Sequence, residues 1–209
     1  MSEPPTIPAS FFVRVDESSD ALFYREPRFV THIDDATIDS LTNFYRQFLQ
    51  VNSDVLDLMS SWISHLPADV DFSRVSGLGM NLEELQRNPR LDDFQVHDLN
   101  ENPQLPYPDS SFDRVTIAVS IQYLIRPQEV FSSIAKVLRP DGEVCIAMSH
   151  RLFATKAIAA FQHLAQADRI ALVRSYLQRN GFIEIEYIDR SPDNADPLWL
   201  VVGRSPGKE

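Results

Sequence analysis

The sequence is poor in glycine, cysteine and basic residues, and it lacks a long apolar run. It has six glycines and one cysteine, Cys145, among 209 residues. A single cysteine cannot form an intramolecular disulfide, so we expect a reducing, cytoplasmic location. No apolar run approaches the roughly 20 residues of a membrane span. The opening residues, MSEPPTIPASFF, do not resemble a signal peptide.

Acidic side chains outnumber basic ones, 30 against 19, and the formal net charge is −11. A diffuse negative field repels phosphate backbones, so we expect no nucleic-acid partner. Hydrophobic residues make up 44% of the chain, which is enough for a folded core. The length favours one domain with a small appendage. We expect a tail and a helical lid segment over 1–52, an α/β domain over 53–204 and a tail over 205–209.

Strand-like and helix-like segments alternate along the chain. Apolar spacing predicts a helix within 32–49, capped by Asp34 or Asp35. This alternation predicts an α/β fold with a Rossmann-like, doubly wound, mostly parallel sheet and helices on both faces. The short polar link between the last two strands permits a C-terminal antiparallel hairpin. Strands are expected at 53–58, 73–80, 92–99, 112–121, 143–150, 183–190 and 197–204, further helices at 62–66, 82–88, 128–138, 153–165 and 168–178, and a turn at 139–142.

Ligands of such sheets bind beyond the carboxyl ends of the strands, so we expect site residues in the loops there. Asp98 ends the third expected strand, LPYPDSSFD (105–113) leads into the fourth, and VLRPDG (137–142) leads into the fifth. This region resembles the centre of class I S-adenosylmethionine-dependent methyltransferases of the type 11 kind. The resemblance covers about residues 54–204. It implies S-adenosylmethionine as cofactor, S-adenosylhomocysteine as product, and an unidentified small molecule as methyl acceptor.

The first loop, DLMSSW at 57–62, departs from the family pattern of an acid followed by alternating glycines. Met59, Ser61 and Ile63 occupy the glycine positions, and Gly79 stands where the family usually has an acid for the ribose hydroxyls. A left-handed non-glycine residue costs about 1–2 kcal/mol, so we expect a reshaped loop. Ser60 and Ser61 hydroxyls could donate to the methionyl carboxylate or cap the next helix. DLMSSW with GLGMNLEEL resembles a glycine-poor subgroup of cyanobacteria and plants.

The resemblance also implies site residues. Asp98 is expected to accept a hydrogen bond from the adenine amino group, and Asn81 or Glu84 to replace the ribose acid in part. Plainer alternatives remain: Asp57 and Asp98 as caps, the loop after the fourth strand as the start of a helix, and the apolar residues as core. The expected cofactor residues are Asp57, Leu58, Met59, Ser60, Ser61, Gly79, Met80, Asn81, Asp98, Leu99, Ser120 and Ile121. The expected acceptor residues are Tyr24, Arg28, Gln122, Tyr123 and Arg151.

Methyl transfer needs mainly the alignment of two reactants in a dry pocket, so no catalytic residue is assigned. His32, His65 and His150 are the candidate bases. His32 with Asp34 and Asp35 lacks a second ligand cluster, and we expect no metal site. The alternative function is a non-catalytic module of the same fold that binds a ligand or a protein. A nicotinamide-dependent enzyme is least favoured, because G-x-G-x-x-G is absent.

Overall fold

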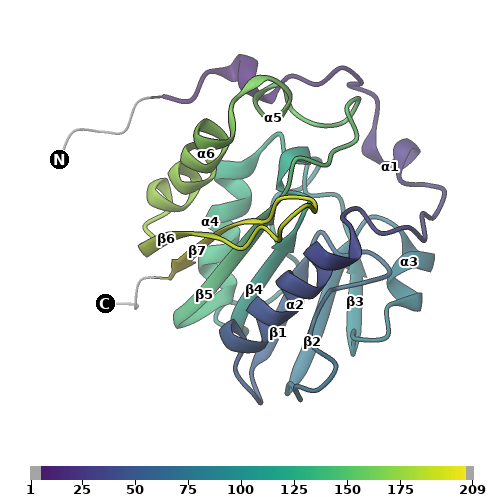
Figure 1. The fold of residues 1–209 in the computed structure, drawn as a ribbon, viewed down its shortest axis with the longest axis vertical. Coiled ribbons are helices and arrows are strands. Elements are labelled where there is room, and N and C mark those ends of the chain that lie inside the picture. Colours follow the sequence, from purple (N-terminus) through teal and green to yellow (C-terminus); the bar gives the residue numbers. More distant parts are fainter. Residues whose placement is uncertain (1–5, 206–209) are drawn as a thin grey trace.

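A computed structural model describes residues 6–205, which form a seven-stranded sheet in the order β3-β2-β1-β4-β5-β7-β6 (Figure 1). The neighbouring pairs among β1 to β5 are parallel, whereas β7 is antiparallel to β5 and β6. The predicted fold class and the C-terminal antiparallel hairpin are therefore confirmed. The strands are β1 (Asp54–Leu58), β2 (Arg74–Gly79), β3 (Asp93–Val96), β4 (Phe112–Ala118), β5 (Leu138–Met148), β6 (Ile183–Asp189) and β7 (Trp199–Arg204).

Helices cover both faces of the sheet (Figure 1). The longest two are α2 (Asp35–Phe48), on one face, and α6 (Gln166–Arg179), on the other. The Asp34 side chain caps α2 by accepting a hydrogen bond from the Thr37 N–H at 2.9 Å, as the sequence predicts. The remaining helices are η1 (Ala9–Phe12), α1 (Asp20–Phe23), α3 (Leu82–Arg87), η2 (Ile121–Tyr123), α4 (Pro127–Val137) and α5 (Ala159–His163).

Alternation along the strands divides the core between the two faces. In β1, Val55 packs in the cluster that contains α2, while Leu56 packs in the cluster that contains α4 and α6. Successive strand residues point to opposite faces, which explains why these strands read as nearly continuous apolar runs. Burial raises the pKa of the Cys145 thiol, which lies fully buried in β5.

The helix expected over 62–66 is wrong, because residues 59–73 contain no helix. Two carbonyls that a helix would use accept hydrogen bonds from elsewhere. The Ser61 carbonyl accepts from Asn88 Nδ2 at 2.8 Å, and the His65 carbonyl accepts from Thr42 Oγ1 at 2.9 Å. The chain after β1 is therefore an irregular loop fixed by distant side chains.

Two other expectations need correction. The helix expected over 153–165 is reduced to α5, and β5 continues through the turn expected at 139–142. There Asp141 adopts a left-handed φ of 62°, and the register with β4 shifts, so the chain bends without leaving the sheet. Residues 1–5 and 206–209 of the two expected tails lie outside the described residues.

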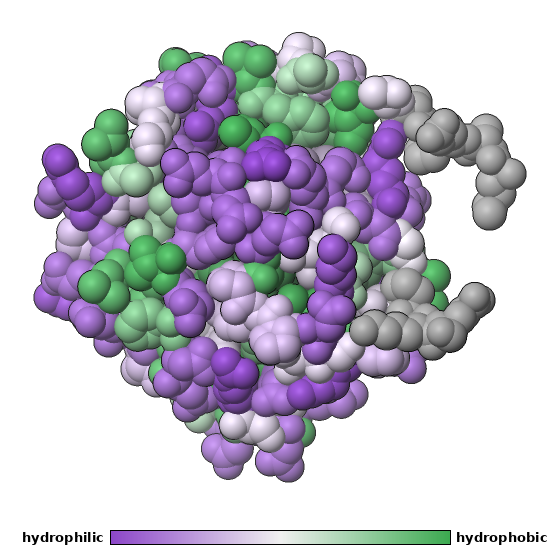
Figure 2. Space-filling model, turned by 180° about the vertical axis from the view of Figure 1, so that it is seen from behind, coloured by the Kyte–Doolittle hydropathy of each residue, from purple (hydrophilic) through white to green (hydrophobic). Residues whose placement is uncertain are grey.

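Seen from behind, apolar side chains form separate groups among hydrophilic ones (Figure 2). The helices of residues 6–205 are all too short or too polar to cross a membrane. The described part of the chain also lacks any group of three or more histidine, cysteine, aspartate or glutamate residues placed to hold a metal ion.

Candidate functional site

A cavity lies beyond the carboxyl ends of the parallel strands. One side is formed by residues 14–30, hereafter the strap, and the others by the loops after β1 to β4 and by Phe153. The expected cofactor residues that line the cavity are Asp57, Met59, Ser60, Ser61, Gly79, Met80, Asn81, Asp98, Leu99 and Ser120. From the expected acceptor residues and candidate bases, the cavity brings together Tyr24, Arg28, His32, His65 and Tyr123.

Five expected site residues lie elsewhere. Leu58 and Ile121 are buried in the hydrophobic core. Gln122 is buried and donates to the backbone carbonyls of Val119 and Arg151. His150 and Arg151 both pair with Asp196, at 2.9 Å each. These five side chains lie in the core or bond to other loops and do not line the cavity, so we do not retain them in the site.

Several lining residues were missed by sequence reasoning. Phe153 stood within an expected helix, Val119 within an expected strand, and Asn100 within the loop after Asp98. Their places directly after strand ends were the available signal, because ligand sites gather there in such sheets. Asp20 is also in the lining, but its position in the strap left no comparable signal.

Asp57 organises the glycine-free loop through hydroxyl groups. Its Oδ2 accepts from Ser60 Oγ at 2.5 Å and Ser64 Oγ at 2.7 Å, and its Oδ1 accepts from Thr116 Oγ1 at 3.3 Å. Burial nevertheless dominates and raises the pKa of this carboxyl from 3.8 to about 6. Ser61 Oγ donates to Glu84 Oε2 at 2.6 Å. The hydroxyls of Ser60 and Ser61 therefore both donate to carboxylates of the protein and are not free to donate to a methionyl carboxylate.

Met59 adopts the backbone conformation that a glycine would adopt at this position. Its φ is 59°, and two other non-glycine residues of the cavity, His65 at 56° and Val119 at 48°, are also left-handed. Such backbone strain is costly and clusters at ligand sites. The loop thus keeps a glycine-like conformation although it has no glycine.

Replacing Met59 tests this strain. Met59→Gly and Met59→Ala both remove the side chain, so their difference isolates the backbone. We expect the glycine variant to be more stable than the alanine variant by about 1 kcal/mol, in urea denaturation. At exposed Gln178 inside α6, the same pair should show the opposite order. A more stable alanine variant at Met59 would contradict the left-handed assignment.

The same loop explains why position 79 is a glycine. The Ser60 N–H donates to the Leu78 carbonyl at 2.8 Å, which brings the Ser60 backbone against the end of β2. A Cβ at Gly79 would overlap the Ser60 carbonyl oxygen. The position that usually carries the ribose acid can therefore hold no side chain here.

Gly79→Ala is expected to lower the free energy of unfolding by about 3 kcal/mol, because backbone must move to admit the methyl group. Gly77→Ala is the matched control in the same strand. There the added Cβ meets only the end of the Leu91 side chain, which can rotate away. Thermal and denaturant unfolding of both variants would measure the difference. Equal losses would show that the Ser60 contact does not restrict this position.

Glu84 lies where it could replace the missing acid. It is buried, its Oε1 accepts from the Arg28 backbone N–H at 2.6 Å, and its Oε2 accepts from Ser61. A carboxylate can accept about four hydrogen bonds, so capacity remains. Asn81 is fully used, because its Oδ1 caps α3 and its Nδ2 donates to the carbonyls of Tyr24 and Arg25.

Asp98 both shapes its loop and lines the cavity. Its Oδ1 accepts from the backbone N–H groups of Asn100 at 2.9 Å and Glu101 at 3.3 Å. Its Oδ2 makes no hydrogen bond within residues 6–205. The cap and the acceptor interpretations are therefore compatible.

Two neutral histidines line the cavity. Burial lowers the pKa of His65 to about 4, with a smaller contribution from nearby His32, and burial also lowers the pKa of His32. Within the described residues, His65 Nδ1 and Ser120 Oγ are buried without a hydrogen-bond partner. Buried polar atoms are rarely left unpaired, so these atoms indicate a polar ligand.

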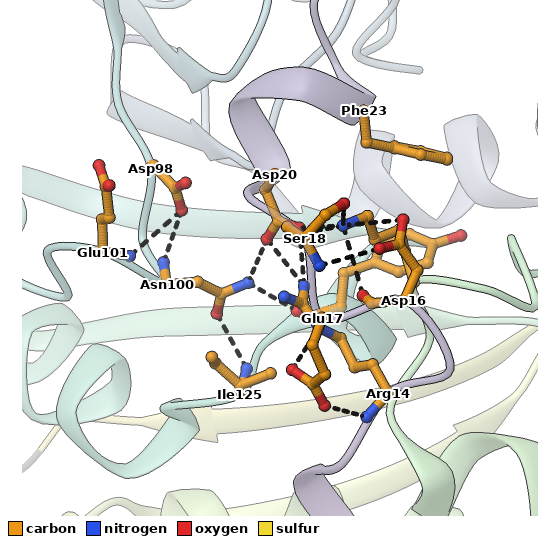
Figure 3. A network of polar contacts seen from close by, with 12 residues as sticks. Arg14, Asp16, Glu17, Ser18, Asp20, Phe23, Asp98, Asn100, Glu101 and Ile125 are labelled. Atoms are coloured by element: carbon orange, nitrogen blue, oxygen red, sulfur yellow. Dashed lines mark hydrogen bonds and ion pairs between the residues drawn. The ribbon is translucent and has the colours of Figure 1, made fainter.

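The strap is tied to the rest of the site by a buried polar network (Figure 3). Asp20 accepts from Arg14 Nη1 at 2.7 and 2.9 Å and from Asn100 Nδ2 at 2.8 Å, and it pairs with Lys156 at 3.2 Å. Asn100 also accepts from the Ile125 N–H at 2.9 Å. The network therefore joins the strap to the loops after β3, β4 and β5.

Comparison with known proteins gives one family match. Residues 65–146 match the model of a family described as "Methyltransferase domain". No curated protein sequence matches significantly.

Solved structures give the fold. A S-adenosylmethionine-dependent methyltransferase from Mesorhizobium loti has a TM-score of 0.57 at 18% identity, over 80% of this chain and 99% of that one. Phosphoethanolamine N-methyltransferase 2 of Haemonchus contortus, in complex with S-adenosyl-L-methionine, has 0.59 at 16%, over 80% and 52%. The [4+2]-cyclase SpnF has 0.60 at 16%, over 81% and 82%.

The family match begins in the middle of the loop after β1 and ends near the end of β5, and the likeness to the Mesorhizobium loti structure covers 80% of this chain. Residues 65–146 therefore resemble a methyltransferase domain of the type 11 kind, and the described residues have the fold of class I S-adenosylmethionine-dependent methyltransferases.

Proposed function

We propose that the protein transfers the methyl group of S-adenosylmethionine to a small molecule held beneath the strap. One observation carries the proposal: a single cavity joins the loops after β1, β2, β3 and β4, in the order that the family resemblance requires. The cofactor supplies a methyl group on a sulfonium. We further propose that the chain belongs to the glycine-poor subgroup with DLMSSW, since its loop is organised by Asp57 and serine hydroxyls.

The cofactor's parts fit residues along the cavity. Asp98 Oδ2 is proposed to accept from the adenine amino group, with Met80 and Leu99 packed against the ring. Glu84 is proposed to accept from a ribose hydroxyl, because Gly79 cannot. The amino-acid end would lie by Met59 and Ser120, whose hydroxyl has no partner in the described chain.

The acceptor is proposed to lie between the strap and the loops after β4 and β5. Tyr24, Tyr123 and Phe153 form an aromatic wall there, which favours close alignment of the reacting atoms. His32, whose pKa is lowered by burial, is the proposed base for a proton of the attacking group, whereas the pKa of about 4 makes His65 a weak base near pH 7.

Calorimetric titration tests the proposal. We expect saturable binding of S-adenosylmethionine and S-adenosylhomocysteine, weakened about tenfold in Asp98→Ala by loss of one hydrogen bond to a charged group. Asp39→Ala, an exposed acid on α2, is the control and should bind as wild type does. Absence of binding up to about millimolar ligand, an affinity too weak for a cofactor, would reject the proposal.

The second candidate is a module of this fold that binds another ligand without methyl transfer. It is favoured by the occupied Ser60 and Ser61 hydroxyls and by Gly79 at the ribose position. The same titration separates the two, because only the methyltransferase needs the cofactor.

A further inference from the structure

Arg28 is held in the strap with its guanidinium among three aromatic rings, Phe23, Tyr24 and Phe153, hereafter the aromatic cage. Its Cζ lies 4.3 Å from the ring centroid of Phe23, 5.6 Å from that of Phe153 and 5.8 Å from that of Tyr24. Its Nη2 donates to the Phe23 carbonyl at 2.8 Å. The cage and this hydrogen bond fix the cation in the wall of the cavity.

The guanidinium has no anionic partner in residues 6–205. Its Nη1 is buried and makes no hydrogen bond there. The two buried cations of this region differ from half-buried Arg28, because Arg14 pairs with Asp20, and Lys156 pairs with both Asp16 and Asp20. Glu84 is bonded to the Arg28 backbone N–H and not to its side chain.

A cation taken from water without an anion is unfavourable, and ring faces compensate only in part. An arriving carboxylate would restore the missing charge and match the planar fork of the guanidinium. His65 Nδ1 and Ser120 Oγ, the other unpartnered buried atoms of cavity residues, belong to neutral side chains. Arg28 is thus the residue of the cavity lining whose unpaired positive charge favours a negatively charged ligand group.

We propose that Arg28, in its aromatic cage, is the binding site for a carboxylate of a ligand in the cavity. This inference rests on the proposed function for the identity of the ligands. Two sources share this chemistry, the methionyl carboxylate of the cofactor and a carboxylate on the methyl acceptor. In the first case, the strap binds the methionyl carboxylate that the Ser60 and Ser61 hydroxyls are not free to bind.

Calorimetry on Arg28→Met tests the site. Arg25→Met is the matched control in the same strap, because Arg25 is exposed and, among residues 6–205, forms its ion pair with exposed Glu26. The probes are S-adenosylhomocysteine with its decarboxylated analogue, and benzoate with neutral benzamide. Circular dichroism first establishes that each variant is folded, and Arg28→Lys, which keeps the charge without the fork, is expected to give intermediate affinities.

If the carboxylate is the cofactor's, Arg28→Met should weaken S-adenosylhomocysteine at least tenfold and leave the decarboxylated analogue unchanged. If it is the acceptor's, S-adenosylhomocysteine should bind unchanged while the preference for benzoate over benzamide is lost. The proposal is overturned if wild type prefers neither carboxylate, or if Arg28→Met changes neither preference. Benzoate is also titrated into protein without cofactor, so failure to bind S-adenosylhomocysteine would reject the proposed function and still leave Arg28 tested.

Discussion

Asp20→Ala is expected to lower the free energy of unfolding by about 3–5 kcal/mol, because it leaves two buried cations close together without their shared carboxylate. The side chains of Arg14, Asp20 and Lys156 are 5%, 6% and 1% exposed, so water cannot replace the lost charge. Asn100 also loses its partner in the strap. The strap should detach first, and limited proteolysis should cut within residues 14–30 at a higher rate.

Two variants control this result. Lys156→Met removes one cation and leaves Asp20 paired with Arg14, so its loss of stability should be much smaller. Asp69→Ala breaks the exposed pair with Arg46 and should change stability little. Denaturant unfolding measures all three. A loss in Asp20→Ala no greater than that in Asp69→Ala would contradict the role of the buried network.

Asp57→Asn is expected to stabilise the protein at neutral pH. Burial disfavours the charge of this carboxyl and raises its pKa from its ordinary value of 3.8 to about 6. A difference of about 2 units corresponds to roughly 3 kcal/mol. A raised pKa stabilises the fold below pH 3.8, and this stabilisation is lost as the pH rises through 6. The variant stays neutral, so its advantage should appear between about pH 4 and 6 and persist above.

The control for this prediction has the opposite sign. The ion pair with Arg74 lowers the pKa of Asp93, so Asp93 stabilises the fold above its unfolded pKa, and Asp93→Asn should destabilise it near pH 7. Denaturation curves of both variants from pH 4 to 8 measure the two trends. If Asp57→Asn is no more stable than wild type at pH 8, the charge of Asp57 is not a cost to the fold. A measured gain in stability for Asp57→Asn would show that the site keeps an unfavourable charge at Asp57, as functional sites often do.

The sequence was sufficient to predict the sheet and the position of the site. The buried run of β4 and the link before β7 reflect local patterns that a parallel sheet with a final hairpin imposes. Asp57, Gly79 and Asp98 lie at or just after the carboxyl ends of β1, β2 and β3, so their convergence at one edge followed from topology alone.

Contacts between distant residues could not be predicted in this way. The loop after β1 is not helical because Asn88 and Thr42 bond its carbonyls, and neither pairing is visible in the local pattern. Lys156 meets Asp20 across more than half of the chain, so the buried network that fixes the strap had no sequence signal. Arg28 was expected to contact the methyl acceptor. Nothing in the sequence indicated that its Nη1 would be buried without a hydrogen-bond partner in the described residues.

The central claim is that the glycine-free loop after β1, which is organised by side-chain hydrogen bonds, still binds S-adenosylmethionine beneath the strap. The most direct measurement is a crystal structure of the protein grown with saturating S-adenosylhomocysteine. We expect the adenine amino group within hydrogen-bond distance of Asp98, and the amino-acid end beside Met59 and Ser120. The hydrogen bonds that Asp57 accepts from hydroxyl groups should remain intact. S-adenosylhomocysteine bound elsewhere, or a cavity without it at millimolar concentration, would contradict the claim.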